Sequence, residues 1–169
     1  LTELDDLIES KKPEFEHPEL QGDIAKVFGR DQDALDYWMA AMETYPTPAL
    51  VAKIGQTRIA ANELELAREF LSDARGRQLL NDSGYGLLAR LHLYDADYAT
   101  AEALMAEAKE NDAYSEALQL EHAIARFVAQ DPQGARTLLQ PLHSNVGEDD
   151  PVPDFLNRNP AAEEPDAEP

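Results

Sequence analysis

The sequence predicts an all-α protein, a solenoid of four stacked antiparallel helix hairpins, and two observations support that prediction. The chain is similar to itself at a period of about 34 residues, so that four segments align on alanines spaced by 33, 34 and 34 residues. Those alanines are Ala34, Ala67, Ala101 and Ala135. Within each segment apolar residues recur at intervals of three and four, which is typical of helices. Since so short a unit cannot enclose a core alone, neighbouring units must cover one another.

Each unit is predicted to contain two helices separated by a short break. In the first unit the helices are marked by Ile24, Val27 and Phe28, and then by Ala34, Leu35, Trp38, Ala41 and Met42. The break holds Gly29, which can adopt the left-handed conformation that ends a helix. It also holds Asp31, whose carboxylate can accept hydrogen bonds from the first amides of the next helix. Residues 61–63, 94–97 and 130–132 occupy the corresponding place in the other units, so we expect a tight hairpin in each.

A common pattern of small and bulky residues runs through the units. It comprises Gly22, Ala34, Trp38, Ala41 and Pro46 in the first; Val51, Ile54, Gly55, Ala67, Leu71 and Ala74 in the second; and Tyr85, Leu88, Ala89, Ala101, Met105 and Ala108 in the third. The fourth keeps Ala123, Ala135 and Leu139, but has His122 where a large apolar residue is expected and Leu142 where a small one is. This pattern resembles the tetratricopeptide repeat (TPR) family over about residues 15–143. The resemblance implies a right-handed superhelical solenoid and a role in protein binding, without naming the partner.

Two segments flank the predicted solenoid of residues 15–143. Residues 1–14 comprise a short amphipathic helix, with Leu1, Leu4, Leu7 and Ile8 on one face, and a linker. This helix is either a cap on the first hairpin or the remnant of a truncated repeat. Residues 144–169 form an acidic, Pro-rich tail that cannot bury enough apolar surface to fold alone. The tail is either disordered or docked on the last hairpin through Val152, Phe155 and Leu156.

The charge of the chain restricts its partners. Thirty-four acidic residues against 14 basic ones give a formal net charge of −20. Residues 148–169 contribute eight acids and one base, a net of −7 that leaves −13 elsewhere. Such a charge disfavours binding to nucleic acid or to an anionic membrane surface, so we expect a basic or apolar protein or peptide partner. It also suits the solubility of a bacterial-type acidic protein.

The sequence gives no indication of a membrane span. No apolar stretch approaches the ~18 to 20 residues that a spanning helix needs, and no signal peptide is recognisable. Because the sequence begins at Leu1, the removal of a signal or anchor segment is an open alternative. The choice between cytoplasm and periplasm is open as well. The absence of cysteine excludes disulfides and thiol catalysis but is compatible with either compartment.

Catalytic and metal-binding motifs are not recognisable, so we expect neither an enzyme nor a cofactor. His17, His92, His122 and His143 are dispersed, and none has the additional ligands at helical spacing that would indicate a metal site. The two glycines of residues 83–86 superficially resemble a phosphate loop, but no strand precedes them and no lysine follows in the required place. We interpret this stretch as a turn and helix cap.

The resemblance to TPR proteins implies that the first helix of each hairpin lines a concave groove. The residues expected on that side are Glu19, Asp23 and Lys26; Lys53, Gln56 and Ile59; Arg90, Leu93 and Tyr94; and Leu120, Ile124 and Phe127. From these we predict that the partner is bound by Lys26, Lys53, Gln56, Ile59, Arg90, Tyr94 and Phe127. In relatives that bind a C-terminal carboxylate, lysine, asparagine and arginine recur along the groove. Here only Lys53 and Arg90 supply central cations, and asparagine is lacking, so a chaperone-tail receptor is disfavoured.

These observations favour a non-enzymatic scaffold or adaptor that binds a peptide or protein in the groove. Its preorganised surface would retain more of the interaction energy as affinity. Three alternatives stay open. The apolar end of the groove can be filled by the chain's own tail; the chain can be a homo-oligomerisation module; or its acidic surface can mimic nucleic acid and block a basic protein.

Overall fold

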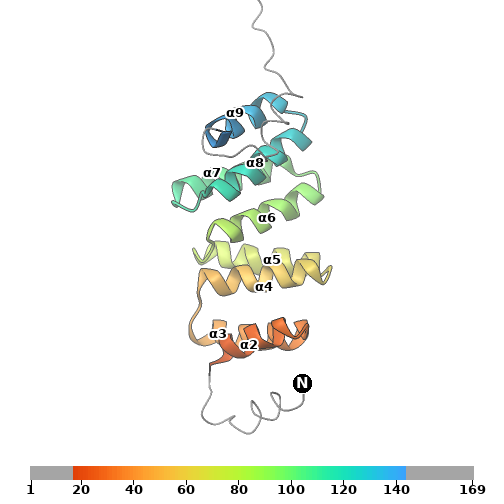
Figure 1. The fold of residues 1–169 in the computed structure, drawn as a ribbon, viewed down its shortest axis with the longest axis vertical. Helices are drawn as coiled ribbons and strands as arrows, with labels where there is room; N and C mark the ends of the chain where they lie inside the picture. The colour runs from red at the N-terminus through yellow and green to blue at the C-terminus, as the bar shows by residue number, and fades with distance from the viewer. Residues whose placement is uncertain (1–16, 144–169) are drawn as a thin grey trace, which may run out of the picture.

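The computed structural model of the chain describes residues 17–143, and the predictions made for residues 1–14 and 144–169 lie outside this range. Within it eight helices follow one another: α2 (Pro18–Val27), α3 (Asp31–Thr44), α4 (Pro48–Ala60), α5 (Leu64–Gly76), α6 (Asp82–Tyr94), α7 (Tyr98–Glu110), α8 (Glu116–Val128) and α9 (Pro132–His143). They stack in pairs along the long axis of the molecule (Figure 1). None of the described residues belongs to a strand.

The eight helices form the four predicted hairpins. Each of α2, α4, α6 and α8 packs on the helix that follows it, and the first helices also contact one another, α4 with α6 and α6 with α8. The second helix of each of the first three hairpins packs on the first helix of the next. Contacts therefore join neighbouring units, as the prediction of a solenoid requires.

The four alanines on which the repeats align are buried between packed helices. Ala34, Ala67 and Ala135 are completely buried, and Ala101 is 1% exposed. The bulky residue four positions later in each unit is buried as well: Trp38, Leu71, Met105 and Leu139. Small residues therefore let the helices approach, and large ones fill the space beside them.

Glycines on the first helices also allow close packing. A Cβ atom built on Gly22 would lie 2.5 Å from Trp38 Nε1, and one built on Gly55 would lie 2.9 Å from Leu71 Cδ2. Both distances are well below the 3.5 to 4.0 Å of an ordinary contact between carbon atoms. The large side chains of α3 and α5 thus lie directly against the backbones of their partner helices.

The turns within the hairpins are tight, but their residues differ from what the sequence led us to expect. Gly29 has the predicted positive φ of 70°. Asn62, Ala96 and Gln130 adopt nearly the same conformation without being glycine, with φ between 57° and 63°. Asp31 does not cap α3; it is the first residue of that helix, and its carboxylate instead accepts from Lys26 Nζ at 3.0 Å.

Several helices begin at side-chain caps. In each, an oxygen of the residue before the helix accepts a hydrogen bond from the amide three residues later: Thr47 for α4, Asn81 for α6, Asp97 for α7 and Ser115 for α8. The cap at Asn81 corrects the interpretation of residues 83–86, which lie inside the first turns of α6 and not in a turn before it. The helix begins at Asp82 because the Asn81 side chain satisfies the amide of Gly84 while its carbonyl accepts from the amide of Tyr85.

Two residues used to recognise the first helix are not part of its buried face. Val27 is 83% exposed, and Phe28 is 41% exposed and follows the end of α2. The buried residues of α2 are instead Gly22 and Ala25. Because α3 supplies the large Trp38 at this contact, α2 needs small residues on its inner face.

Candidate partner-binding groove

Two hollows lie along the face formed by the first helices α2, α4, α6 and α8, which we call the groove face. The N-terminal hollow, about 420 Å³, lies between α2 and α4, and its walls include Trp38 of α3; its lining residues are Asp23, Lys26, Val27, Trp38, Lys53, Gln56, Thr57 and Ala60. The central hollow, about 230 Å³, lies among α4, α6 and α8; it is lined by Ala52, Gln56, Asp82, Ser83, Gly86, Leu87, Arg90, Ala117, Leu118 and Glu121. Gln56 lines both hollows, which are therefore adjacent.

Lys53 lines the N-terminal hollow and is bound by two acidic side chains. Its ammonium group lies 2.7 and 2.8 Å from the two carboxylate oxygens of Asp23 and 2.9 Å from Glu19 Oε1. Burial by itself would lower the pKa of Lys53, but hydrogen bonds to Asp23 and Glu19 outweigh this and raise it. Asp23 also accepts from Trp38 Nε1 at 3.0 Å. The lysine is therefore held as a cation between two acids of the preceding hairpin.

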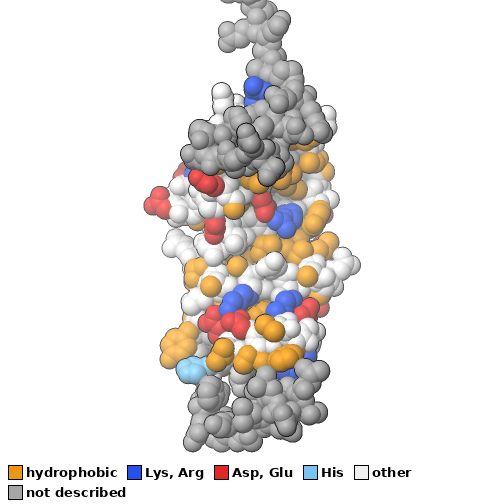
Figure 2. All heavy atoms as spheres, viewed as in Figure 1, with side chains coloured by type: hydrophobic (Ala, Val, Ile, Leu, Met, Phe, Trp, Pro, Cys, Tyr) orange, Lys and Arg blue, Asp and Glu red, His pale blue; other side chains and the backbone are white. Residues whose placement is uncertain are grey.

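The other two cations of the hollows are also bound to carboxylates. In the central hollow Arg90 of α6 donates from Nη2 to Glu121 of α8. Lys26 donates to Asp31, as described above. Figure 2 shows cationic and acidic side chains next to one another at two levels of the stack. A partner carboxylate would have to displace one of the chain's own, so the hollows are not a ready carboxylate clamp.

Ion pairs of this kind cross each joint between hairpins. Lys53 binds Glu19 and Asp23 across the first joint; Arg68 binds Asp95 and Arg75 binds Glu107 across the second; Arg90 binds Glu121 and Arg126 binds Glu102 across the third. Partly exposed pairs contribute only about 0 to 1 kcal/mol each to stability. Their main effect here is to fix the charged side chains of one hairpin against the next.

The structure distributes the seven predicted binding residues over different environments. Lys26, Lys53, Gln56 and Arg90 line the hollows. Ile59 is partly buried against the core and lines neither hollow. Tyr94 and Phe127 are 62% and 43% exposed but do not line either hollow. The charged half of the prediction thus gathers at the hollows, and the aromatic half lies toward the C-terminal end.

Reasoning from the sequence missed several residues of the hollows, among them Trp38, Ala52, Asp82, Gly86 and Glu121. A periodic signal was available for some of them. Ala52 and Gly86 precede Gln56 and Arg90 by four residues, one helical turn, and therefore share their faces. Gly86 is small because α8 packs closely there: a Cβ atom at this position would lie 3.2 Å from Leu118 Cδ1.

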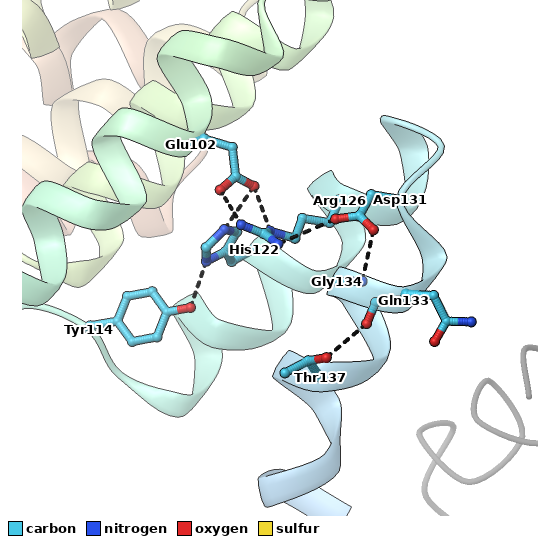
Figure 3. A network of polar contacts seen from close by, with 8 residues as sticks. All are labelled: Glu102, Tyr114, His122, Arg126, Asp131, Gln133, Gly134 and Thr137. Atoms are coloured by element: carbon cyan, nitrogen blue, oxygen red, sulfur yellow. Dashed lines mark hydrogen bonds and ion pairs between the residues drawn. The ribbon is translucent and has the colours of Figure 1, made fainter. Parts of the chain in front are cut away.

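A second polar feature joins α7 to the fourth hairpin, at the place where the repeat pattern has His122 in place of a large apolar residue (Figure 3). His122 is 4% exposed, with Nδ1 2.7 Å from the hydroxyl of Tyr114 and Nε2 2.9 Å from Glu102 Oε1. Arg126 donates to both oxygens of Glu102, at 2.9 and 2.8 Å, and contacts Asp131 at 3.3 Å. The imidazole thus replaces an apolar side chain with a fully hydrogen-bonded polar one.

The protonation states of this cluster follow from its surroundings. Burial lowers the pKa of His122, and the hydrogen bond with Glu102 offsets this only in part. Burial raises the pKa of Tyr114 to about 12, so the phenol stays protonated. A neutral imidazole can then donate from Nε2 to Glu102 and accept at Nδ1 from Tyr114. With the phenol protonated and every ring nitrogen occupied, the cluster is a polar joint between hairpins.

The structure also bears on His92, on metal binding and on membrane spans. His92 Nδ1 lies 3.1 Å from Asp97 Oδ2. Within residues 17–143, no group of three or more histidine and carboxylate side chains is arranged to hold a metal ion. In the same range, none of the helices combines the length and apolar character needed to cross a membrane.

Comparison with known proteins supports the fold. No protein-family model matches the sequence, and no curated protein is significantly similar to it. Among solved structures, the crystal structure of a thermophilic TPR protein from Thermus thermophilus is similar, with a TM-score of 0.63 and 17% sequence identity. The similarity covers 83% of this chain and 80% of that one. At this identity the likeness shows the fold alone, and it confirms the resemblance seen in the sequence: the chain folds as a TPR-like, right-handed superhelical solenoid of antiparallel helix hairpins.

Proposed function

We propose that the chain is a non-enzymatic scaffold that binds a protein or peptide along its groove face. The observation that carries the proposal is that the two hollows are adjacent, since Gln56 lines both, and that together they extend over α2, α4, α6 and α8. Helical solenoids use such extended surfaces for binding. Here the ion pairs across the joints hold the side chains of that surface in place before a partner arrives, which reduces the entropy lost on binding.

The charges at the hollows favour a basic or neutral partner over an acidic one. Acidic side chains outnumber basic ones at the hollows by four to three: the acids are Glu19, Asp23, Asp82 and Glu121, and the bases are Lys26, Lys53 and Arg90. Lys26 is also bound to Asp31. Lys53 and Arg90 are the two central cations that the sequence placed on the groove side. Since both are engaged by carboxylates of the chain, we assign them to holding Asp23 and Glu121 toward lysine, arginine or backbone amide groups of a partner.

A steric change at Gln56 tests this proposal directly. Gln56 is exposed and lines both hollows, so Gln56→Phe should obstruct the groove face without altering its charge. The matched control is Ser72→Phe, at an exposed position of α5 in the same hairpin that lines neither hollow. We expect Gln56→Phe to weaken capture of the partner by about tenfold or more, corresponding to about 1.4 kcal/mol.

The measurement has two stages. Proteins retained from the native cell by the unmodified chain and by the Ser72→Phe control, but lost with Gln56→Phe, are identified first. Each is then titrated against the purified chain at low and high salt, where a basic partner should bind more weakly as salt rises. Equal capture by all three forms would show that the groove face is not the binding surface.

A further inference from the structure

From Leu120 to its end, α8 presents an apolar surface that the hollows do not include. Leu120, Ile124, Phe127 and Val128, which we call the α8 apolar face, are 38%, 55%, 43% and 51% exposed. Leu120, Ile124 and Val128 follow one another at four-residue intervals and so lie on one side of the helix. This side adjoins the central hollow, because Ala117 and Glu121 of the neighbouring turns line it. Exposed apolar residues grouped in this way are typical of an interaction surface.

The path of the chain brings its next residues to this surface. The helices α8 and α9 are antiparallel, and Gln119 Nε2 near the start of α8 donates to the carbonyl of Leu138 in the second half of α9 at 2.5 Å. The chain therefore leaves α9 at His143 close to the beginning of α8. Eight residues, 144–151, then separate His143 from Val152. An extended stretch of that length spans at most about 26 to 29 Å, and α8 with its 13 residues is about 20 Å long.

The segment that comes within reach has the right chemistry to cover the surface. Residues 152–156 read Val-Pro-Asp-Phe-Leu and place three large apolar side chains in a stretch that is otherwise acidic, with a net charge of −7 over residues 148–169. The prolines at 151 and 153 favour an extended backbone, which can lie along a helix without first folding. We infer that residues 152–156 dock within the same molecule on the α8 apolar face, with Val152, Phe155 and Leu156 as the contacting side chains.

This docking would regulate the groove face. The α8 apolar face adjoins the central hollow, so a segment lying on it occupies the C-terminal end of the surface assigned to the partner. A partner must then displace the segment, and its apparent affinity falls by the fraction of molecules in which the face is free. This consequence rests on the proposed function, whereas the docking itself does not.

The contact is testable by disulfide trapping in the full chain, which has no cysteine of its own. Ile124→Cys is combined with Leu156→Cys, and the rate of disulfide formation is measured at low protein concentration under a mild oxidant. The matched variant carries in addition Val152→Ser and Phe155→Ser, which remove the apolar anchors but leave the tether length unchanged. Because these serines lie outside the solenoid, its helical content should be the same in both forms, as circular dichroism can verify.

Docking predicts that the within-chain disulfide forms about fivefold or more faster when Val152 and Phe155 are present, since tethering alone gives both forms the same effective concentration. Amide hydrogen exchange over residues 116–128 of the cysteine-free chain should likewise quicken when the two serines are introduced. Equal cross-linking rates and equal exchange would overturn the inference. Disulfides formed mainly between chains would also overturn it, because the occupant would then be a second copy. Neither experiment uses a partner, so failure of the proposed function would not affect the result.

Discussion

Replacing Gly22 by alanine should destabilise the first hairpin, although alanine is normally the better helix residue. The added Cβ atom would lie 2.5 Å from Trp38 Nε1 and 2.9 Å from Trp38 Cγ, with Cδ1 closer still. The indole cannot easily move away, because it is 2% exposed and its Nε1 donates to Asp23. An overlap of roughly 1 Å relative to an ordinary contact must therefore be relieved by a shift of one helix against the other.

The expected magnitude is the difference between two opposing effects. Overpacking of a close contact costs about 1 to 3 kcal/mol, and the present overlap lies toward the upper end of that range. The change from glycine to alanine inside a helix returns about 1 kcal/mol. We therefore expect Gly22→Ala to lower the free energy of unfolding by about 1 to 2 kcal/mol.

Urea unfolding followed by two signals measures this effect. Circular dichroism reports the helices as a whole, and Trp38, the single tryptophan of the chain, reports the first hairpin by its fluorescence. The control is Gly76→Ala at the end of α5, where an added Cβ atom would meet nothing within 4 Å. This control should be neutral or stabilising by up to about 1 kcal/mol. If Gly22→Ala proved as stable as the control, the close packing of α2 on Trp38 would be wrong.

Three further predictions follow from other features. Ala67→Leu should overpack the hairpin of α4 and α5 by about 1 to 3 kcal/mol, and a change within ~0.5 kcal/mol in denaturant melts would contradict the repeat register. Since burial lowers the pKa of His122, the unfolded chain binds this proton more readily, so stability should fall as pH drops below about 6.5. His122→Leu should make that fall shallower in melts across pH 5 to 8, roughly the range in which histidine titrates. The double change Arg90→Ala with Tyr94→Ala should weaken partner capture by about 2 kcal/mol or more, and Glu69→Lys on the second-helix face should weaken it much less. If a binding titration showed the larger loss for Glu69→Lys, recognition through the acidic outer surface would be favoured.

The fold was predictable because its determinants recur along the chain. Close helix contacts demand small residues at fixed intervals, so Ala34, Ala67, Ala101 and Ala135 show the repeat without knowledge of any contact. The turns were less predictable. A positive φ of about 60° is adopted by Asn62, Ala96 and Gln130, because the hydrogen bonds that close the hairpin impose it whichever residue is present.

The site was predictable only in part, and for a similar reason. Helical periodicity placed Lys53 and Arg90 on the first helices at the hollows, and it placed Glu19 and Asp23 on the same face. It did not predict that these acids bind Lys53, and it missed Glu121, which binds Arg90. Those partners lie one repeat away, since Lys53 and Glu19 are 34 residues apart and Arg90 and Glu121 are 31 apart. Pairing across a joint depends on the stagger between adjacent hairpins, and a single sequence does not contain that stagger. An acid one period from a groove cation is the signal to look for in similar chains.

The polar joint around His122 has a consequence for how the molecule unfolds. The main core extends through the first three hairpins and reaches α8 only at Leu118, whereas Ala123, Ala135 and Leu139 form a separate, smaller cluster. Besides the packing of α8 on α6 and α7 and the Arg90–Glu121 pair, the third and fourth hairpins are therefore joined by the polar coupling of Glu102, His122 and Arg126. Coupling of this kind is sensitive to pH and salt in a way that apolar packing is not. Because protonation of the buried His122 weakens this joint, the fourth hairpin should open as its own cooperative unit before the rest of the chain, so that mild acid shortens the solenoid from its C-terminal end while the first three hairpins stay folded.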